Sequence, residues 1–370
     1  MDLLFSPIEI GSLKLQNRIV MPPMATFGHA VSQPGVSQRG LVTDSVVKHY
    51  QEAAQGGPGL IIVESTTVKE KRGGSEQRGL WSNAHIEGQK RIVDVIHKEG
   101  TPCLVQIQTS GVTAKEPLDP RLCISDYDSD MTGVSLKGVE MTVEQIRQFE
   151  AMFVEAAIRA QMAGYDGVEL HAAHGYFLSQ TLSPRVNHRT DAYGGSSQNR
   201  ARVACEIAQQ IVQACGRDFF LAIRMGVNDP DPSETARLIT VLKEAGISLF
   251  DLSTGFLKME NPNAIPLPVP ADYPYSPLVF GAQKVKEQVD ARTVCVGEIH
   301  TPQRAEAILQ AGIADLVAIG RDLLIDPNWP NKARRGVPMV TCMGCKTRCL
   351  WFRDTQSCPA LKKRLSMEVK

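Results

Sequence analysis

The segment Thr142–His171 reads TVEQIRQFEAMFVEAAIRAQMAGYDGVELH and contains one helix followed by one strand. Thr142, with Gln145 three residues later, forms a capping box, which predicts the start of a helix. Gly164 predicts its end, because glycine permits the left-handed conformation that stops a helix. The run Asp166–His171 follows this stop and is interpreted as a strand, with Val168 and Leu170 as its apolar side chains. This segment therefore predicts an α/β fold.

The same alternation of strand and helix extends in both directions. Eight strands are expected, at Arg18–Pro22, Gly59–Glu64, Pro102–Ile107, Asp166–His171, Phe219–Arg224, Ser248–Leu252, Thr293–Val296 and Ala314–Ile319. Helices are expected at Ser45–Gln55, Ala84–Lys98, Thr142–Ala163, Gln198–Cys215, Ser233–Ala245, Phe280–Val289 and Pro302–Ala311. The stretch Gln108–Glu140 shows no clear periodicity and is interpreted as a long excursion.

Eight strand–helix units predict a (β/α)8 TIM barrel. An open doubly wound sheet is the alternative, but it would carry a Gly-x-Gly-x-x-Gly turn after its first strand, and the chain has no such motif. We expect the barrel to occupy residues 1–335. A short cysteine-rich extension is expected at residues 336–370.

Composition excludes several classes of function. The 370 residues carry 40 basic and 40 acidic side chains, so the chain lacks the positive charge of a nucleic-acid binder. No apolar run approaches the ~20 residues that span a membrane. The N-terminus lacks the basic and apolar regions of a secretory signal. We expect a cytoplasmic homo-oligomer that binds neither nucleic acid nor membrane.

A TIM barrel places its active site at the C-terminal ends of its strands. Polar and glycine residues at those ends are Gln106, His171, His174, Tyr176, Arg224, Gly297, Gly320 and Arg321. The histidines supply two donors and the tyrosine a proton source, whereas a zinc site at the histidines would lack a third ligand at a recognised spacing. Gln106 and Arg224 suit a flat redox-active ring that becomes anionic on reduction. Gly297, Gly320 and Arg321 suit a phosphate, although turn glycines and a surface arginine explain them equally well.

Longer motifs carry a resemblance to a known family. They are Leu15–Met24 (LQNRIVMPPM), Gly59–Glu64 (GLIIVE), Trp81–Gly88 (WSNAHIEG), His171–Pro184 (HAAHGYFLSQTLSP), Asn187–Gly195 (NHRTDAYGG) and Ile319–Leu324 (IGRDLL). Over nearly its whole length the chain resembles the Old Yellow Enzyme flavoproteins. The resemblance implies non-covalent FMN and hydride transfer from flavin N5 to an activated C=C bond.

The same resemblance assigns roles by position. The residues implied to bind FMN are Pro23, Met24, Ala25 and Ser65 along the ring, Gln106 at its pyrimidine edge, Arg224 at N1, and Gly297, Gly320 and Arg321 at the phosphate. His171 and His174 would bind the carbonyl or carboxylate oxygen of the substrate, and Tyr176 would deliver the proton. The chain departs from many relatives at Ala25, where they carry cysteine or threonine. It also departs at Phe27, where some carry tyrosine. A proline-rich loop, Phe256–Val279, is expected to cover the site.

Four of the nine cysteines lie within the last 29 residues, at Cys342, Cys345, Cys349 and Cys358. Four thiolates so close together could hold a 4Fe-4S cluster or a zinc ion. The spacing resembles the family branch that contains 2,4-dienoyl-CoA reductase, enoate reductases and trimethylamine dehydrogenase, which implies a 4Fe-4S cluster. The gap before Cys358 is shorter than in those relatives.

These features predict an FMN-dependent ene-reductase acting on a small α,β-unsaturated carbonyl, carboxylate or CoA thioester. Longer relatives continue into a domain that supplies electrons through the cluster. Because only 12 residues follow Cys358, we expect a separate donor, namely a ferredoxin, an electron-transfer flavoprotein or a reductase subunit. Direct reduction by NAD(P)H is the alternative. Two other functions stay open: an amine dehydrogenase or demethylase of the trimethylamine-dehydrogenase type, and a non-catalytic zinc-stapled barrel subunit of a redox complex.

Overall fold

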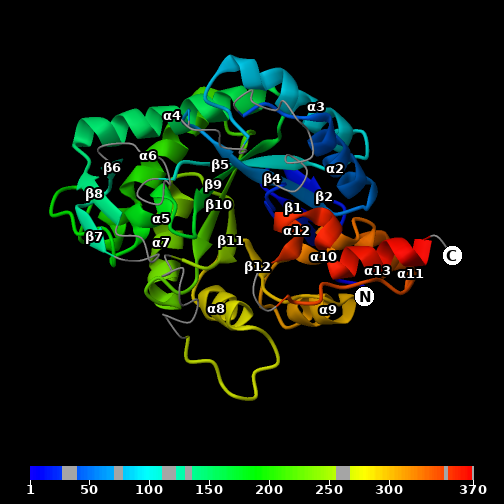
Figure 1. Cartoon of the computed structure of the whole chain (residues 1–370). Coiled ribbons are helices and arrows are strands. Elements are labelled where there is room, and N and C mark those ends of the chain that lie inside the picture. The colour runs from blue at the N-terminus through cyan, green and yellow to red at the C-terminus, as the bar shows by residue number, and fades with distance from the viewer. Residues whose placement is uncertain are drawn as a thin grey trace.

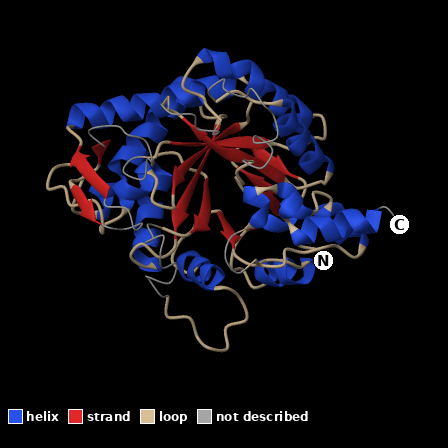
Figure 2. Ribbon diagram, viewed as in Figure 1, coloured by secondary structure: helices blue, strands red, loops and turns tan. Residues whose placement is uncertain are grey.

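The structure is a computed structural model of the whole chain, and it describes residues 1–26, 40–70, 78–110, 122–129, 136–255, 267–345 and 349–368. Its centre is a closed barrel of eight parallel strands (Figures 1 and 2). These are β3 (Ile19–Met21), β4 (Leu60–Thr67), β5 (Cys103–Gln108), β9 (Gly167–Ala172), β10 (Phe220–Gly226), β11 (Leu249–Ser253), β12 (Thr293–Val296) and β13 (Leu316–Ala318). The predicted TIM barrel is thereby confirmed, with every strand overlapping its expected range.

Helices surround the barrel, as Figure 2 shows in blue. They are α2 (Asp44–Gln55), α3 (Ile86–His97), α4 (Val143–Met162), α5 (Phe177–Leu182), α6 (Ser197–Cys215), α7 (Pro232–Glu244), α8 (Pro277–Lys286), α9 (Pro302–Gln310), α10 (Arg321–Ile325) and α11 (Trp329–Arg335). The capping box at Thr142 and Gln145 is present as predicted. The expected range Phe280–Val289 was wrong by three residues, because Ser276 caps α8 and Pro277 occupies its first turn.

The sequence prediction missed two small sheets. The excursion Gln108–Glu140 contains β6 (Leu122–Cys123), β7 (Tyr127–Ser129) and β8 (Leu136–Glu140), which pair with one another. A hairpin of β1 (Ile8–Ile10) and β2 (Leu13–Leu15) precedes the barrel. Strands of two to five residues are too short to show a period of two, so the sequence gave no signal for them.

The β1–β2 hairpin closes the N-terminal end of the barrel. Its four apolar side chains pack in one buried cluster with Leu104 and Phe220, which lie at the beginnings of their strands. A second and larger cluster fills the space between the strands and the helices. Because these side chains fill the N-terminal end of the barrel, the C-terminal end is the one available for a binding site.

The cysteine-rich tail lies against the barrel next to α10 and α11 (Figure 1). It contains α12 (Leu350–Arg353), a short 3-10 helix (Thr355–Ser357) and α13 (Pro359–Glu368). Trp351 is only 3% exposed and belongs to the same buried cluster as the barrel helices. The boundary at residues 335 and 336 stays a prediction. Within the described parts of the chain, no helix has the length and apolar character needed to cross a bilayer.

Candidate active site at the barrel mouth

Four neighbouring strands bring the predicted site residues together. In the register of the sheet, Gln106 on β5 lies opposite Glu169 on β9. Arg224 on β10 lies between His171 on β9 and Asp251 on β11, facing each across one strand pair. Pairing of these neighbouring parallel strands therefore brings residues more than a hundred positions apart into one site.

The three predicted catalytic residues form one cluster. The rings of His171 and His174 are 5.1 Å apart, and the ring of Tyr176 lies 4.6 Å from that of His171. His174 has φ of 59°, a left-handed conformation that a side chain other than glycine rarely adopts. Its backbone N–H donates to the carbonyl of Thr254, which helps to hold this conformation. Backbone strain of this kind is often found at functional sites.

Ser253, at the end of β11, links the histidine pair to the arginine. Its Oγ lies 2.9 Å from Nε2 of His174 and accepts a hydrogen bond of 3.4 Å from Nη2 of Arg224. Ser253 is not among the site residues predicted from the sequence. Its position at the C-terminal end of a barrel strand was the signal that could have identified it.

The environment favours neutral imidazoles. Burial lowers the pKa of His171 well below its usual value, and His174 and Arg224 lower it further. Desolvation by the surrounding protein, and then the charge of Arg224, also lower the pKa of His174. Part of the His174 side chain is still in contact with solvent at the mouth. A neutral imidazole can donate one hydrogen bond without bringing a positive charge. The pair can therefore bind an oxygen that is neutral before reaction and negative during it.

Two buried carboxylates lie below this cluster. Gln106 donates from Nε2 to Oε1 of Glu169 at 2.7 Å, and Nε of Arg224 lies 3.3 Å from Oδ2 of Asp251. Glu169 and Asp251 are both fully buried. Burial, followed by the negative charge of Asp251, raises the pKa of Glu169 to about 8. The sequence prediction assigned neither residue, although a charged residue inside an apolar barrel strand was the available signal.

The other predicted residues line the same mouth, at the ends of β3, β4, β12 and β13. A Cβ placed on Gly320 would come within 3.4 Å of Sδ of Met24, so the ends of β3 and β13 lie in contact. Gly297 has φ of 131°, and a Cβ there would collide with Oγ of Ser276 at 2.4 Å. Pro23, Met24, Ala25, Ser65, Gly320 and Arg321 are half-buried. Phe27 and the first part of the loop Phe256–Val279 lie outside the described residues.

The four tail cysteines line one small cavity of about 20 Å³ together with Arg321, Leu324 and Trp351. Arg321 is thus shared between this cavity and the predicted phosphate site. Asp322 accepts a 2.6 Å hydrogen bond from the backbone N–H of Cys342 and lies 2.7 Å from Nδ1 of His300. The structure therefore brings the four predicted cysteines together, directly beside the end of β13.

Residues 3–339 match the model of the NADH:flavin oxidoreductase / NADH oxidase family. The chain belongs to this family. It is the family of FMN-dependent, Old Yellow Enzyme-like oxidoreductases to which the motifs pointed. A relative named NADPH dehydrogenase, from Bacillus subtilis, is 36% identical over 341 residues, which are 90% of this chain and 94% of the relative.

Other members of the family are longer. A protein named metal reductase, from Desulforamulus reducens, is 34% identical over 359 residues, which are 95% of this chain and 52% of that protein. The chain therefore spans about half the length of some curated relatives. Among solved structures, a 2-naphthoyl-CoA reductase in complex with 2-naphthoyl-CoA superposes with a TM-score of 0.82 at 24% identity, over 95% of this chain and 56% of that one. This likeness supports the barrel fold.

The residues at the mouth fit the FMN of this family. Oγ of Ser65 and Nδ1 of His171 are buried polar atoms with no hydrogen-bond partner among the described residues. Such atoms are rare in folded proteins unless a ligand satisfies them. Gly320 directly precedes α10, so the backbone N–H groups at the start of this short helix lie at the barrel mouth beside Arg321. Both features are expected of a flavoprotein barrel.

Proposed function

We propose that the chain is an ene-reductase that binds FMN at the barrel mouth and reduces an activated C=C bond. The observation that carries the proposal is the cluster of His171, His174 and Tyr176, joined through Ser253 to Arg224. When bound, FMN supplies a hydride from its N5. The protein must then bind the substrate oxygen, orient the double bond and provide one proton.

His171 and His174 bind the carbonyl or carboxylate oxygen of the substrate. Hydride addition to the β-carbon moves electrons onto this oxygen, so hydrogen bonds to it strengthen in the transition state. Neutral imidazoles suit this role, because protonated ones would bind a carboxylate substrate tightly before reaction. Two N–H donors aimed at one point suit a substrate oxygen better than a cationic amine, which favours the ene-reductase over an amine dehydrogenase.

Tyr176 delivers the proton to the α-carbon. Its ring lies beside His171, and the residue is half-buried at the N-terminus of α5. A phenol is a weak acid that holds its proton at neutral pH and can transfer it to a carbanion as it forms. Hydride and proton together then saturate the double bond.

Arg224, Gln106 and Ser65 would hold the flavin ring, and Gly297, Gly320 and Arg321 would hold its phosphate. Pro23, Met24 and Ala25 would line the ring. Positive charge from Arg224 next to the pyrimidine would stabilise the anionic reduced ring. Ala25 offers no hydroxyl or thiol there, so it makes no hydrogen bond to the flavin.

The tail cysteines would hold a 4Fe-4S cluster, and this cluster would supply a path for electrons from a separate donor protein. No three of the sulfurs of Cys342, Cys345, Cys349 and Cys358, all in described residues, lie within 4.8 Å of one another. Tetrahedral zinc would hold them about 3.8 Å apart. The wider spacing of the sulfurs favours a larger inorganic group, beside Arg321. NADPH is the alternative donor, as the name of the Bacillus subtilis relative suggests.

Tyr176→Phe tests the proton transfer. Reduction of the flavin should be nearly unchanged, whereas reoxidation by an enone should slow by about 100-fold or more, since general acids contribute roughly 10²–10⁴-fold. Stopped-flow measurement of both half-reactions checks this. An equal loss in the two half-reactions would reject Tyr176 as the proton donor.

Cys345→Ala tests the electron path. The variant should keep its flavin absorption, lose the iron–sulfur absorption, and lose turnover driven by a reduced ferredoxin. Turnover driven by dithionite should remain, because the barrel mouth does not include Cys345. Cys215→Ala, at the C-terminus of α6 and outside the tail, is the matched control. Normal ferredoxin-driven turnover in Cys345→Ala would contradict the relay.

A further inference from the structure

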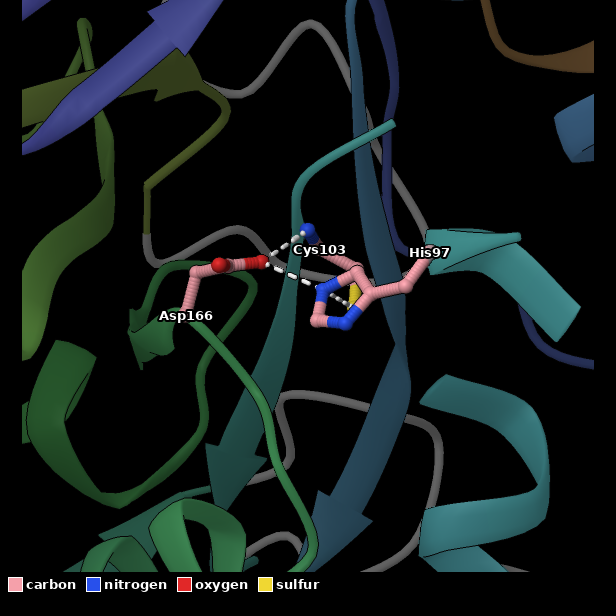
Figure 3. A group of neighbouring side chains, drawn as sticks. All are labelled: His97, Cys103 and Asp166. Carbon is pink, nitrogen blue, oxygen red and sulfur yellow. Dashed lines mark hydrogen bonds and ion pairs between the residues drawn. The ribbon is translucent and has the colours of Figure 1, made fainter. Parts of the chain in front are cut away.

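Three potential metal ligands meet at the end of the barrel opposite the mouth (Figure 3). His97 is the last residue of α3, Cys103 is the first residue of β5, and Asp166 directly precedes β9. Their ligand atoms all lie within 4.8 Å of one another. No other group of this kind is found among the described residues, and the flavin site proposed above lies at the opposite end of the barrel.

The distances suit a transition metal. Nε2 of His97 lies 3.6 Å from Sγ of Cys103, and zinc bound tetrahedrally to a thiolate and an imidazole holds these two atoms about 3.6 Å apart. Nε2 of His97 lies 2.9 Å from Oδ2 of Asp166, where zinc needs about 3.4 Å. The side chains of His97 and Asp166 are 39% and 32% exposed, so they have room to separate by this small amount.

The direction of the thiol and the charge of the three ligands also suit an ion. Cys103 is fully buried, and its sulfur points to the imidazole of His97 (Figure 3). Asp166 is already held in place, because the backbone N–H of Cys103 donates to its Oδ2 at 2.7 Å. A thiolate and a carboxylate together balance the two charges of Zn²⁺. The partial exposure of His97 and Asp166 leaves a route by which the ion enters.

We propose that His97, Cys103 and Asp166 bind one Zn²⁺, with water in the fourth position. The thiol proton of Cys103 is released on binding, and the hydrogen bond between His97 and Asp166 is replaced by two bonds to the metal. The ion connects α3, β5 and the segment that enters β9. Because one ligand position is filled by water, binding should be reversible and weaker than at a four-ligand structural site.

Metal titration of the full-length holoprotein tests this inference. The wild type should bind one Co²⁺ or Zn²⁺ more per chain than His97→Gln and than Cys103→Ser. That Co²⁺ should produce a thiolate charge-transfer band that both variants lack. Cys295→Ser, which changes another fully buried barrel cysteine, should behave as the wild type. Any binding by the tail cysteines is common to all four proteins and cancels in the comparison.

Zinc should also raise the melting temperature of the wild type and of Cys295→Ser, but not that of His97→Gln. His97 is on the surface, so this variant should fold even if Cys103→Ser does not. Equal stoichiometry in wild type and His97→Gln, or an identical zinc-induced shift in melting temperature, would overturn the proposal and leave a hydrogen-bonded triad. Neither result depends on flavin or on turnover.

Discussion

At the scale of single residues, the buried carboxylates below the mouth set the charge around the flavin site. Glu169 and Asp251 share a single neighbouring cation, Arg224, and burial opposes a net negative charge there. One proton is therefore held by the pair near neutral pH. With Glu169 protonated, Gln106 keeps its hydrogen bond and the charge of Arg224 stays balanced by Asp251.

Glu169→Gln should remove a pH dependence from the bound flavin. In the wild type, Glu169 loses its proton as the pH rises through about 8, which places an uncompensated negative charge near the flavin and lowers its reduction potential. The amide cannot titrate. Spectroelectrochemistry between pH 6 and 9.5 should show an inflection in wild-type protein alone. The same inflection in both proteins would assign it to another group.

Ser253→Ala should slow the reduction of the substrate without loss of bound FMN. The change removes the hydrogen bonds to His174 and Arg224, and hydrogen bonds contribute roughly 1 kcal/mol each. We expect reoxidation by an enone to slow about tenfold, with FMN content unchanged. Ser12→Ala, in the exposed turn between β1 and β2 at the opposite end of the barrel, is a control for loss of a serine outside the site. A normal reoxidation rate in Ser253→Ala would show that Ser253 does not position His174.

At the scale of secondary structure elements, the long strands and helices could be predicted because the spacing of their apolar residues shows which face of each element is buried. The site positions followed from the barrel, since strand ends are fixed once eight strands are recognised. The pairings inside the site could not be predicted. Whether Arg224 contacts Asp251 or Ser253 depends on register across β10 and β11, and sequence patterns do not give register in a parallel barrel.

The contact between α4 and α6 predicts a second pH effect. Burial, followed by the carboxylate of Glu206 on α6, raises the pKa of Glu150 on α4 to about 8. The folded chain thus keeps a proton that the unfolded chain loses above about pH 4.5. Stability contributed in this way is present below that pH and is lost as the pH rises towards 8.

Glu150→Gln should therefore be close to wild type in stability at pH 5 and more stable than wild type at pH 8.5. The amide removes the repulsion from Glu206 and needs no proton. Urea unfolding at both pH values measures the difference. Glu155→Gln, on the exposed face of α4, is the control and should change little. If the free energy of unfolding changes between pH 5 and pH 8.5 by the same amount in the wild type and in Glu150→Gln, the Glu150–Glu206 contact does not cause the pH dependence.

At the scale of the whole molecule, the tail and the barrel share one core. The cysteine spacing predicted a compact extension, but the position of that extension depends on apolar contacts that no motif encodes. Trp351 packs near His49 of α2, with ring centroids 6.1 Å apart, and Asp322 of α10 binds the backbone of Cys342. The cavity of the four cysteines is consequently fixed relative to the barrel mouth.

Trp351→Ala should release the tail. Replacing a buried tryptophan with alanine typically costs about 3–5 kcal/mol, and this loss falls on the contact between α12 and the barrel. Backbone amides of α13 should then exchange with solvent much faster than in the wild type, whereas amides of β9 and β10 keep their protection. Met343→Ala, 52% exposed, should leave both regions unchanged. Hydrogen exchange measured by mass spectrometry separates these regions. Unchanged protection of α13 in Trp351→Ala would mean that the tail is held by its cysteines and their bound group, and that the apolar contact with the barrel contributes little.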